Sequence, residues 1–198
     1  MVWDDVCAHY RAQGSGTQYG SLTLKSFCSP DKPTEAFPVL KGSGAEAKDL
    51  LPALREIWHV RAKRHKQYAL IDGALAALVD WQDILSENSD HVLLPIEAVE
   101  RLQRCTDDFL LRYQKLTYTA ERQGLLLWSQ PTKFHWMFHL SHKAMYLNPC
   151  RTSTFIDEDF VGKLKVVLQS CAAGTELHAV CGRMVEKYRW GLHFLTQQ

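Results

Sequence analysis

Two long stretches with inward-facing residues at helical spacing follow one another in the middle of this chain, with only a short loop between them. In residues 68–86 the apolar positions recur every three or four residues, and Gly73 with several alanines permits close approach by a neighbouring helix. From Pro95 to about residue 123 the inward positions follow a heptad, Val99, Leu102, Thr106, Phe109, Tyr113, Leu116 and Ala120. Because the loop is short, the two helices are expected to pack antiparallel.

A heptad seam can also join two chains in a coiled coil, so the partner of the second helix has to be considered. Leu110 and Leu111 lie outside the seam and widen the apolar face of this helix. A wide face favours packing within one chain over the narrow contact of a dimeric coiled coil.

The composition fits a globular domain built of helices. The chain has 198 residues, of which 46% are hydrophobic and 23% are charged, and these values are typical of proteins with a packed core. We predict an all-α fold of about six helices packed as an irregular bundle. The formal net charge of +1 gives no overall field that attracts nucleic acid or a membrane surface, and no apolar run reaches the length of a membrane span.

Further helices are predicted on both sides of the central pair. Before it, Ser43 and Glu46 form the S-x-x-E pattern of a capped helix start, and Pro52 is expected to kink or divide that helix. After it, helical patterns cover residues 132–147, 156–172 and the chain from about residue 175. The first of these has almost no polar side, so we expect it to be buried.

Residues 1–42 are predicted to form an irregular, extended N-terminal arm over a helical domain of residues 43–198. A short helix at the start of the arm is indicated by the spacing of Val2, Trp3, Val6 and Tyr10. The loose alternation over residues 19–27 is typical of a short strand or an extended segment, and three prolines mark a connector.

The six cysteines stand singly, and none forms a C-x-x-C pair. The first residues also lack the basic head and apolar run of a signal peptide. We therefore expect reduced, structural cysteines in an intracellular protein, either cytoplasmic or nuclear.

Three histidines align on the helix expected over residues 132–147. His135, His139 and His142 fall at i, i+4 and i+7 and so share one stripe. Two imidazoles at i and i+4 can reach one ion, and Asp157 or Glu158 could add an oxygen ligand if the next helix folds back. The sequence thus predicts a metal site of His135, His139 and Asp157, and a divalent metal is the only cofactor it leaves open. The alternative is that the histidines are neutral, hydrogen-bonded core residues.

The most basic run of the chain lies within residues 60–66. Its cationic side chains could contact the phosphates of a nucleic acid, and they are Arg61, Lys63, Arg64 and Lys66. The alternative is a solvated helix end, where the helix dipole favours basic side chains. No Gly-rich phosphate loop or aromatic platform accompanies the run in the sequence, which favours the second interpretation.

Four segments resemble uncharacterised, mobile-element-derived proteins that are abundant in large, repeat-rich protist genomes. They are FPVLKGSGAEAKDLLP (residues 37–52), KFHWMFHL (133–140), NPCRTSTFIDEDFVGKL (148–164) and YRWGLH (188–193). The K-x-H-x-x-x-H-L pattern followed by an acidic helix also resembles the C-terminal helical part of cut-and-paste DNA transposases.

The transposase resemblance implies an Asp-Asp-Glu triad that holds two divalent metals on an RNase H-like sheet. Glu158 matches the final acid, with Asp157 and Asp159 beside it. The strands and the two upstream aspartates are not recognisable here, and no other catalytic motif is present. We therefore predict a non-catalytic, mobile-element-derived helical domain that binds a protein or a nucleic acid, with no membrane partner. The alternative is a fragment of a metal-dependent transposase or nuclease that uses an acid near Glu158.

Overall fold

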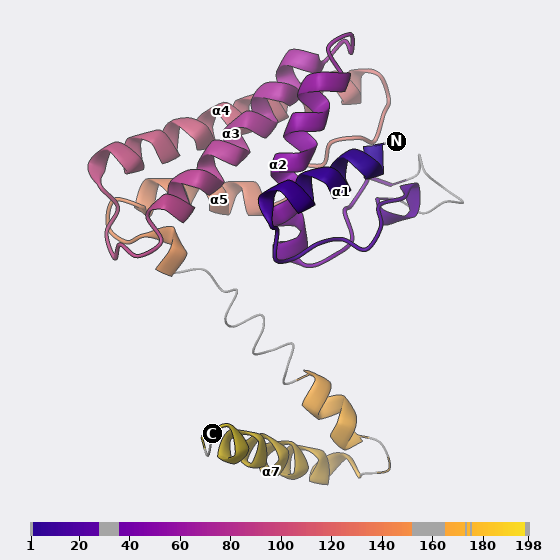
Figure 1. Cartoon of the computed structure of the whole chain (residues 1–198), viewed down its shortest axis with the longest axis vertical. Helices are drawn as coiled ribbons and strands as arrows, with labels where there is room; N and C mark the ends of the chain where they lie inside the picture. The colour runs from indigo at the N-terminus through magenta and orange to yellow at the C-terminus, as the bar shows by residue number, and fades with distance from the viewer. Residues whose placement is uncertain (1, 28–35, 152–164, 173, 175, 197–198) are drawn as a thin grey trace. The chain divides into compact units, whose positions relative to one another are not determined.

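The computed structural model describes residues 2–27, 36–151, 165–172, 174 and 176–196, and every regular element in these ranges is helical (Figure 1). The all-α, irregular helical bundle predicted from the sequence is confirmed. The α-helices are α1 (Val2–Gln13), α2 (Gly44–Arg61), α3 (Tyr68–Glu87), α4 (Ile96–Arg122), α5 (Lys133–Lys143) and α7 (Leu177–Thr196), and two short 3-10 turns are η1 (Leu24–Ser26) and η2 (Pro149–Arg151). The chain divides into two compact units, Met1–Arg151 and Thr152–Gln198.

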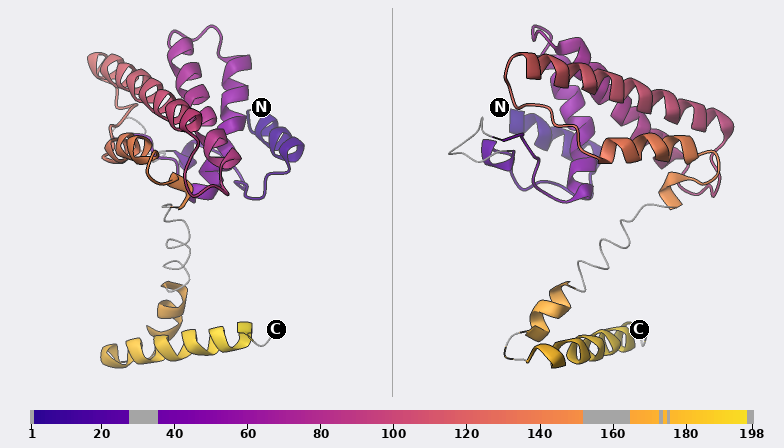
Figure 2. Two further views of the ribbon diagram at one scale, coloured as in Figure 1. Left: turned by 90° about the vertical axis from the view of Figure 1, so that its left-hand side faces the viewer. Right: turned by 180° about the vertical axis from the view of Figure 1, so that it is seen from behind.

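Helices α3 and α4 form the centre of the first unit and run antiparallel, as predicted (Figure 2). At one end, Ile84 and Leu85 of α3 share a hydrophobic cluster with Val99 and Leu102 near the start of α4. Further along, Ala77 of α3 and the later α4 residue Phe109 share a second cluster. Because late α3 residues meet early α4 residues, the two helices must point in opposite directions.

The heptad of α4 is buried within the chain, so the intramolecular interpretation of the seam holds. Its buried side chains include Val99, Leu102, Thr106, Phe109, Leu116 and Ala120. The fully buried polar member, Thr106, donates its hydroxyl to the carbonyl of Leu102 at 2.9 Å, so its burial leaves no unpaired donor. Just after the helix, Gly124 has a φ of 67°, the left-handed conformation in which helices commonly end.

The predicted extended arm is not confirmed for its first part, because α1 begins at Val2 and continues to Gln13. The short helix expected from the spacing is therefore correct, and it packs on α2. Val6 and Tyr10 of α1 lie in one hydrophobic cluster with Leu50 and Ala53 of α2. Residues 17–23 form no regular element, and the expected strand over residues 19–27 is replaced by the turn η1. Burial of one side of α1, and not strand pairing, anchors this segment.

Helix α2 begins as the sequence predicts and ends at the basic run. The Ser43 Oγ accepts a hydrogen bond from the Glu46 N–H at 3.2 Å, and the Glu46 carboxylate accepts one from the Ser43 N–H at 2.7 Å. The Ser43 N–H and the Ser43 hydroxyl both donate to this carboxylate, and these two bonds hold the pKa of Glu46 below its usual value. The helix continues through Pro52 to Arg61 without a break, so the alternative in which Pro52 divides it is wrong.

Asn148 joins the segment after α5 to the loop between α3 and α4. Its fully buried side chain donates to the carbonyl of Asn88 at 2.7 Å and to that of His91 at 2.8 Å, and it accepts from the N–H of Cys150 at 3.0 Å. The Cys150 thiol donates to the carbonyl of Leu85, and burial raises the pKa of this thiol. This junction fixes where the C-terminal end of the first unit leaves the bundle.

The second unit is described over residues 165–172, 174 and 176–196. Residues 165–172 are helical, and α7 follows. Cys171 and Val180 are buried, and the Lys187 ammonium donates to the Ser170 hydroxyl at 3.0 Å. Most of the helix predicted over residues 156–172 lies outside the described residues.

Candidate functional site

The candidate site is an open groove between α4 and α5 in the first unit, which we call the α4–α5 groove. Helix α5 runs alongside α4 in the opposite direction, with its first turns against Phe109 and Tyr113 and its end near Leu102 (Figure 2). The groove between the two helices has a volume of about 710 Å³. Its lining consists of Asp107, Leu110, Leu111, Tyr113, Gln114, Gln130, Pro131, Thr132, Phe134, His135 and Phe138. The lining combines apolar side chains with polar ones and a single carboxylate, that of Asp107.

Edge-to-face aromatic rings give the groove a fixed floor. The Phe134 ring centroid lies 5.3 Å from that of Phe109 and 4.6 Å from that of Tyr113, with interplanar angles of 88° and 80°. Tyr113 in turn packs edge-to-face against Trp128 at 5.5 Å. Such pairs stabilise a particular ring arrangement beyond the burial of area, so the floor is preorganised for binding.

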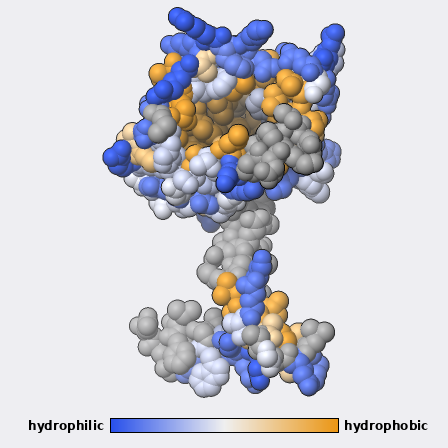
Figure 3. Space-filling model, turned by 90° about the vertical axis from the view of Figure 1, so that its right-hand side faces the viewer, coloured by the Kyte–Doolittle hydropathy of each residue, from blue (hydrophilic) through white to orange (hydrophobic). Residues whose placement is uncertain are grey.

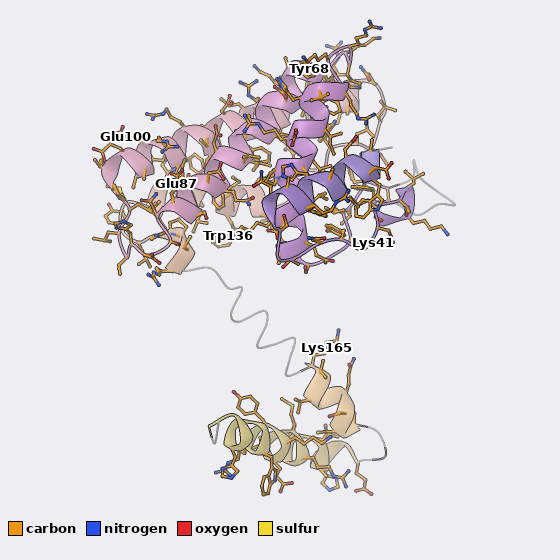
Figure 4. The ribbon with its side chains drawn as sticks, viewed as in Figure 1. Lys41, Tyr68, Glu87, Glu100, Trp136 and Lys165 are labelled. Atoms are coloured by element: carbon orange, nitrogen blue, oxygen red, sulfur yellow. The ribbon has the colours of Figure 1, made fainter. Side chains whose placement is uncertain are left out.

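The prediction that α5 is buried is wrong for much of its surface. Within α5 only Ser141 is fully buried, whereas Trp136 is 67% exposed and Phe138 is 38% exposed. Trp136 projects from α5 in Figure 4. A helix that is apolar all round is normally enclosed, and here only one of its sides has a neighbour among the described elements. Large exposed apolar side chains of this kind mark interaction surfaces.

Other apolar side chains extend this surface beyond the groove. Leu111, within the groove, is 58% exposed. Outside the groove, partly exposed apolar residues are found in the segments on either side of α5, Leu125, Leu126, Leu127, Met145, Tyr146 and Leu147. Figure 3, which views the molecule from the right of Figure 1, shows hydrophobic side chains gathered in a hollow of the first unit, with hydrophilic residues around its edge. An apolar floor with a polar rim is the usual anatomy of a protein-binding patch.

A second groove of about 740 Å³ lies between α1 and α2, but its polar groups are already engaged with one another. The His9 Nδ1 lies 2.8 Å from a Glu56 carboxylate oxygen, and Arg61 pairs with Asp5. These ion pairs fasten α1 to α2. We therefore interpret this groove as a polar helix contact and not as a binding site.

The structure brings together the two predicted histidine ligands but not the full predicted metal site. The Nε2 atoms of His135 and His139 lie 3.0 Å apart on α5, and the two rings are nearly perpendicular. Asp157, the predicted third ligand, and Glu158, the predicted catalytic acid, lie outside the described residues. In the part of the chain that the structure describes, no three His, Cys, Asp or Glu side chains are grouped to hold an ion.

The basic run forms the end of α2 and the turn before α3, away from the α4–α5 groove (Figure 1). Arg61 is neutralised by its ion pair with Asp5. Lys63, Arg64 and Lys66 are exposed, and none of them forms an ion pair with a described residue. The turn also places the His65 ring 5.3 Å from the Trp58 ring, an aromatic neighbour that the sequence analysis missed. The sequence could have indicated this neighbour, because Trp58 lies in the last turn of α2, just before the basic run.

If this turn binds nucleic acid, its affinity for the nucleic acid should fall as the salt concentration rises. Replacing Lys63, Arg64 and Lys66 with glutamine should reduce the slope of log affinity against log salt by about 0.9 for each phosphate that is no longer neutralised. Fluorescence anisotropy with a labelled duplex measures this slope. A control with the same charge change replaces three scattered exposed lysines, Lys25, Lys41 and Lys115. Equal slopes for the two variants would leave the turn as a solvated helix end.

Comparison with known proteins gives no family for this chain: no family model, no curated protein and no solved structure matches it. The function of the chain is therefore inferred from the α4–α5 groove and the residues around it.

Proposed function

We propose that this chain is a non-catalytic helical interaction domain that binds an amphipathic helix of a partner protein in the α4–α5 groove. The observation that carries the proposal is the open, apolar lining of this groove above a floor of edge-to-face aromatic rings. An amphipathic helix lays apolar anchors at i, i+3, i+4 and i+7 into such a groove. Leu111 and Phe138, which line the groove and are 58% and 38% exposed, would supply much of the contact area.

The lining favours a protein over a nucleic acid at this site. None of the residues that line the groove is Lys or Arg, and Asp107 contributes a negative charge to the rim. Nucleic-acid affinity depends mainly on cations that neutralise phosphates, so a phosphate backbone would be repelled here. A basic residue on the polar side of a bound helix would instead pair with Asp107.

A mobile-element origin belongs to the same proposal and rests on the sequence resemblance. The alternative function, a fragment of a metal-dependent transposase or nuclease with an acid near Glu158, rests on that resemblance too, because Glu158 lies outside the described residues. The regular elements of the described ranges are helices, whereas the resemblance implies a catalytic sheet. This difference is why the interaction domain is preferred.

An intracellular location accompanies the proposal. The five cysteines in the described ranges carry free thiols, as expected in a reducing compartment. No helix in those ranges is both long and apolar enough to cross a membrane.

A charge placed in the groove should remove helix binding. We expect Leu111→Asp to weaken a bound helical peptide by about thirtyfold, which corresponds to the loss of one interfacial hot spot of roughly 2 kcal/mol. The probe is a peptide selected from a helix-biased display library against the full chain, and its affinity is measured by fluorescence anisotropy.

Leu93→Asp is the matched control, because Leu93 is 58% exposed, as is Leu111, but lies in the loop before α4. Leu93→Asp should leave the affinity unchanged. Equal affinities for the two variants, or a library that yields no peptide above background, would contradict the groove as the binding site.

A further inference from the structure

The pair His135 and His139 has a geometry that the proposed helix binding does not use. The two imidazoles lie one turn apart on α5, with ring centroids 4.3 Å apart and an interplanar angle of 86°. Their Nε2 atoms are 3.0 Å apart, so one ring N–H donates to the other ring nitrogen. His135 is exposed and His139 is half-buried, so solvent reaches the pair.

No carboxylate competes for these two nitrogens among the described residues. Other histidines are paired to acids, as His9 is to Glu56 and His59 to Asp72. Within the described chain, by contrast, the hydrogen-bond partner of each imidazole of the pair is the other imidazole. Imidazole nitrogens without an acidic partner are good ligands for ions such as copper, zinc and nickel.

The separation of the nitrogens is within the range that one metal ion can bridge. With metal–nitrogen bonds of about 2.0–2.1 Å, two ligands at a right angle lie about 2.9 Å apart, and two tetrahedral ligands lie about 3.4 Å apart. The observed 3.0 Å is the length of the hydrogen bond that the ion would replace, and it lies between these two values, so a small rotation of the rings reaches either. Square-planar and tetragonal coordination by nitrogen and oxygen is typical of Cu(II) and Ni(II), and Cu(II) binds such ligands most strongly.

We propose that His135 and His139 form a two-histidine site for a divalent transition metal, with Cu(II) preferred. The metal replaces the hydrogen bond between the rings: the shared proton moves from Nε2 to Nδ1 of the same ring, and both Nε2 lone pairs turn toward the ion. Water or a partner's side chain completes the coordination. Asp157 is not required, which is the difference from the site predicted from the sequence.

The backbone of α5 is held in a way that preorganises the two ligands. Phe134 and Met137 pack into the cluster around Phe109, and Ser141 is fully buried with its hydroxyl bonded to the carbonyl of Phe138 at 2.8 Å. Only the two imidazoles need to rotate when the ion binds. Small reorganisation of this kind raises affinity, because little conformational entropy is lost.

The test is a Cu(II) titration of the untagged full chain, followed by calorimetry and by electron paramagnetic resonance. We expect one ion per chain with hyperfine coupling to two nitrogens. His135→Ala and His139→Ala should each weaken binding by about a hundredfold, because the second ligand then no longer acts intramolecularly. His142→Ala is the control on the same helix, since His142 bonds to the carbonyl of Phe138 and not to the pair; it should bind as the wild type does.

Circular dichroism of each variant checks that α5 remains folded. If the alanine variants lose helix, His135→Gln decides the matter, because His135 is exposed and glutamine is tolerated there. Binding by His135→Gln or by the folded double alanine variant within about threefold of the wild type, or an equal loss in His142→Ala, would overturn the site. The same result would leave the helix-binding proposal standing, because Leu111→Asp and not histidine loss tests that function.

Discussion

Replacing Phe109 with alanine is expected to lower the free energy of unfolding by about 3–5 kcal/mol. The Phe109 ring is buried between α3 and α4 and packs against Phe134 of α5. Removing it leaves a cavity in a cluster that joins all three helices, so the surrounding structure cannot close the space without moving α5. Urea unfolding followed by circular dichroism measures the change.

Leu111→Ala provides the control for Phe109→Ala, because Leu111 lies two residues further along α4 and points to solvent. Its replacement should change stability by no more than about 0.5 kcal/mol. A loss below about 1 kcal/mol for Phe109→Ala would show that the seam of α4 is exposed in solution, and the packing described here would then be wrong.

Replacing Asn148 with alanine is expected to cost roughly 3 kcal/mol, because it removes three hydrogen bonds at a fully buried position. The His91 carbonyl and the Cys150 N–H lose the Asn148 side chain as their partner, whereas the Asn88 carbonyl keeps the His91 N–H at 3.1 Å. An alanine cannot admit enough water to replace the lost bonds. Asn148→Asp should be at least as damaging, since its carboxylate would face two carbonyl oxygens. Thermal unfolding of both variants checks the prediction.

Asn88→Ala separates the effect of Asn148 from that of the loop itself. The Asn88 side chain bonds to the carbonyl of Ile84 at 2.8 Å, and its own carbonyl still accepts from Asn148 after the change. We expect a loss of about 1 kcal/mol or less. Similar losses in Asn88→Ala and Asn148→Ala would mean that Asn148 does not hold the two segments together.

The elements that depend on local pattern were predictable from the sequence. The heptad of α4 determined its buried side, because a repeated spacing faces one neighbour whatever that neighbour is. The capped start of α2 follows from Ser43 and Glu46 alone, which satisfy each other's backbone groups. The antiparallel pairing of α3 and α4 follows from the length of their loop.

The features that depend on distant contacts were not predictable. Asn148 has the sequence pattern of a helix end before a proline, but its partners lie 57 and 60 residues earlier. The exposure of Trp136 could not be foreseen, because an apolar helix is enclosed only if other elements reach it. One feature of the sequence did indicate the groove. Leu110 and Leu111 add apolar area outside the seam of α4, and both line the groove.

The most direct test of the central claim is a nuclear magnetic resonance titration of the isotope-labelled full chain with the selected helical peptide. We predict that the largest shift changes fall on the groove residues Leu110, Leu111, Phe134 and Phe138, and that Leu93 and the basic turn are unaffected. Shift changes centred on the basic turn or on the contact between α1 and α2 would contradict the assignment of the α4–α5 groove as a helix-binding site.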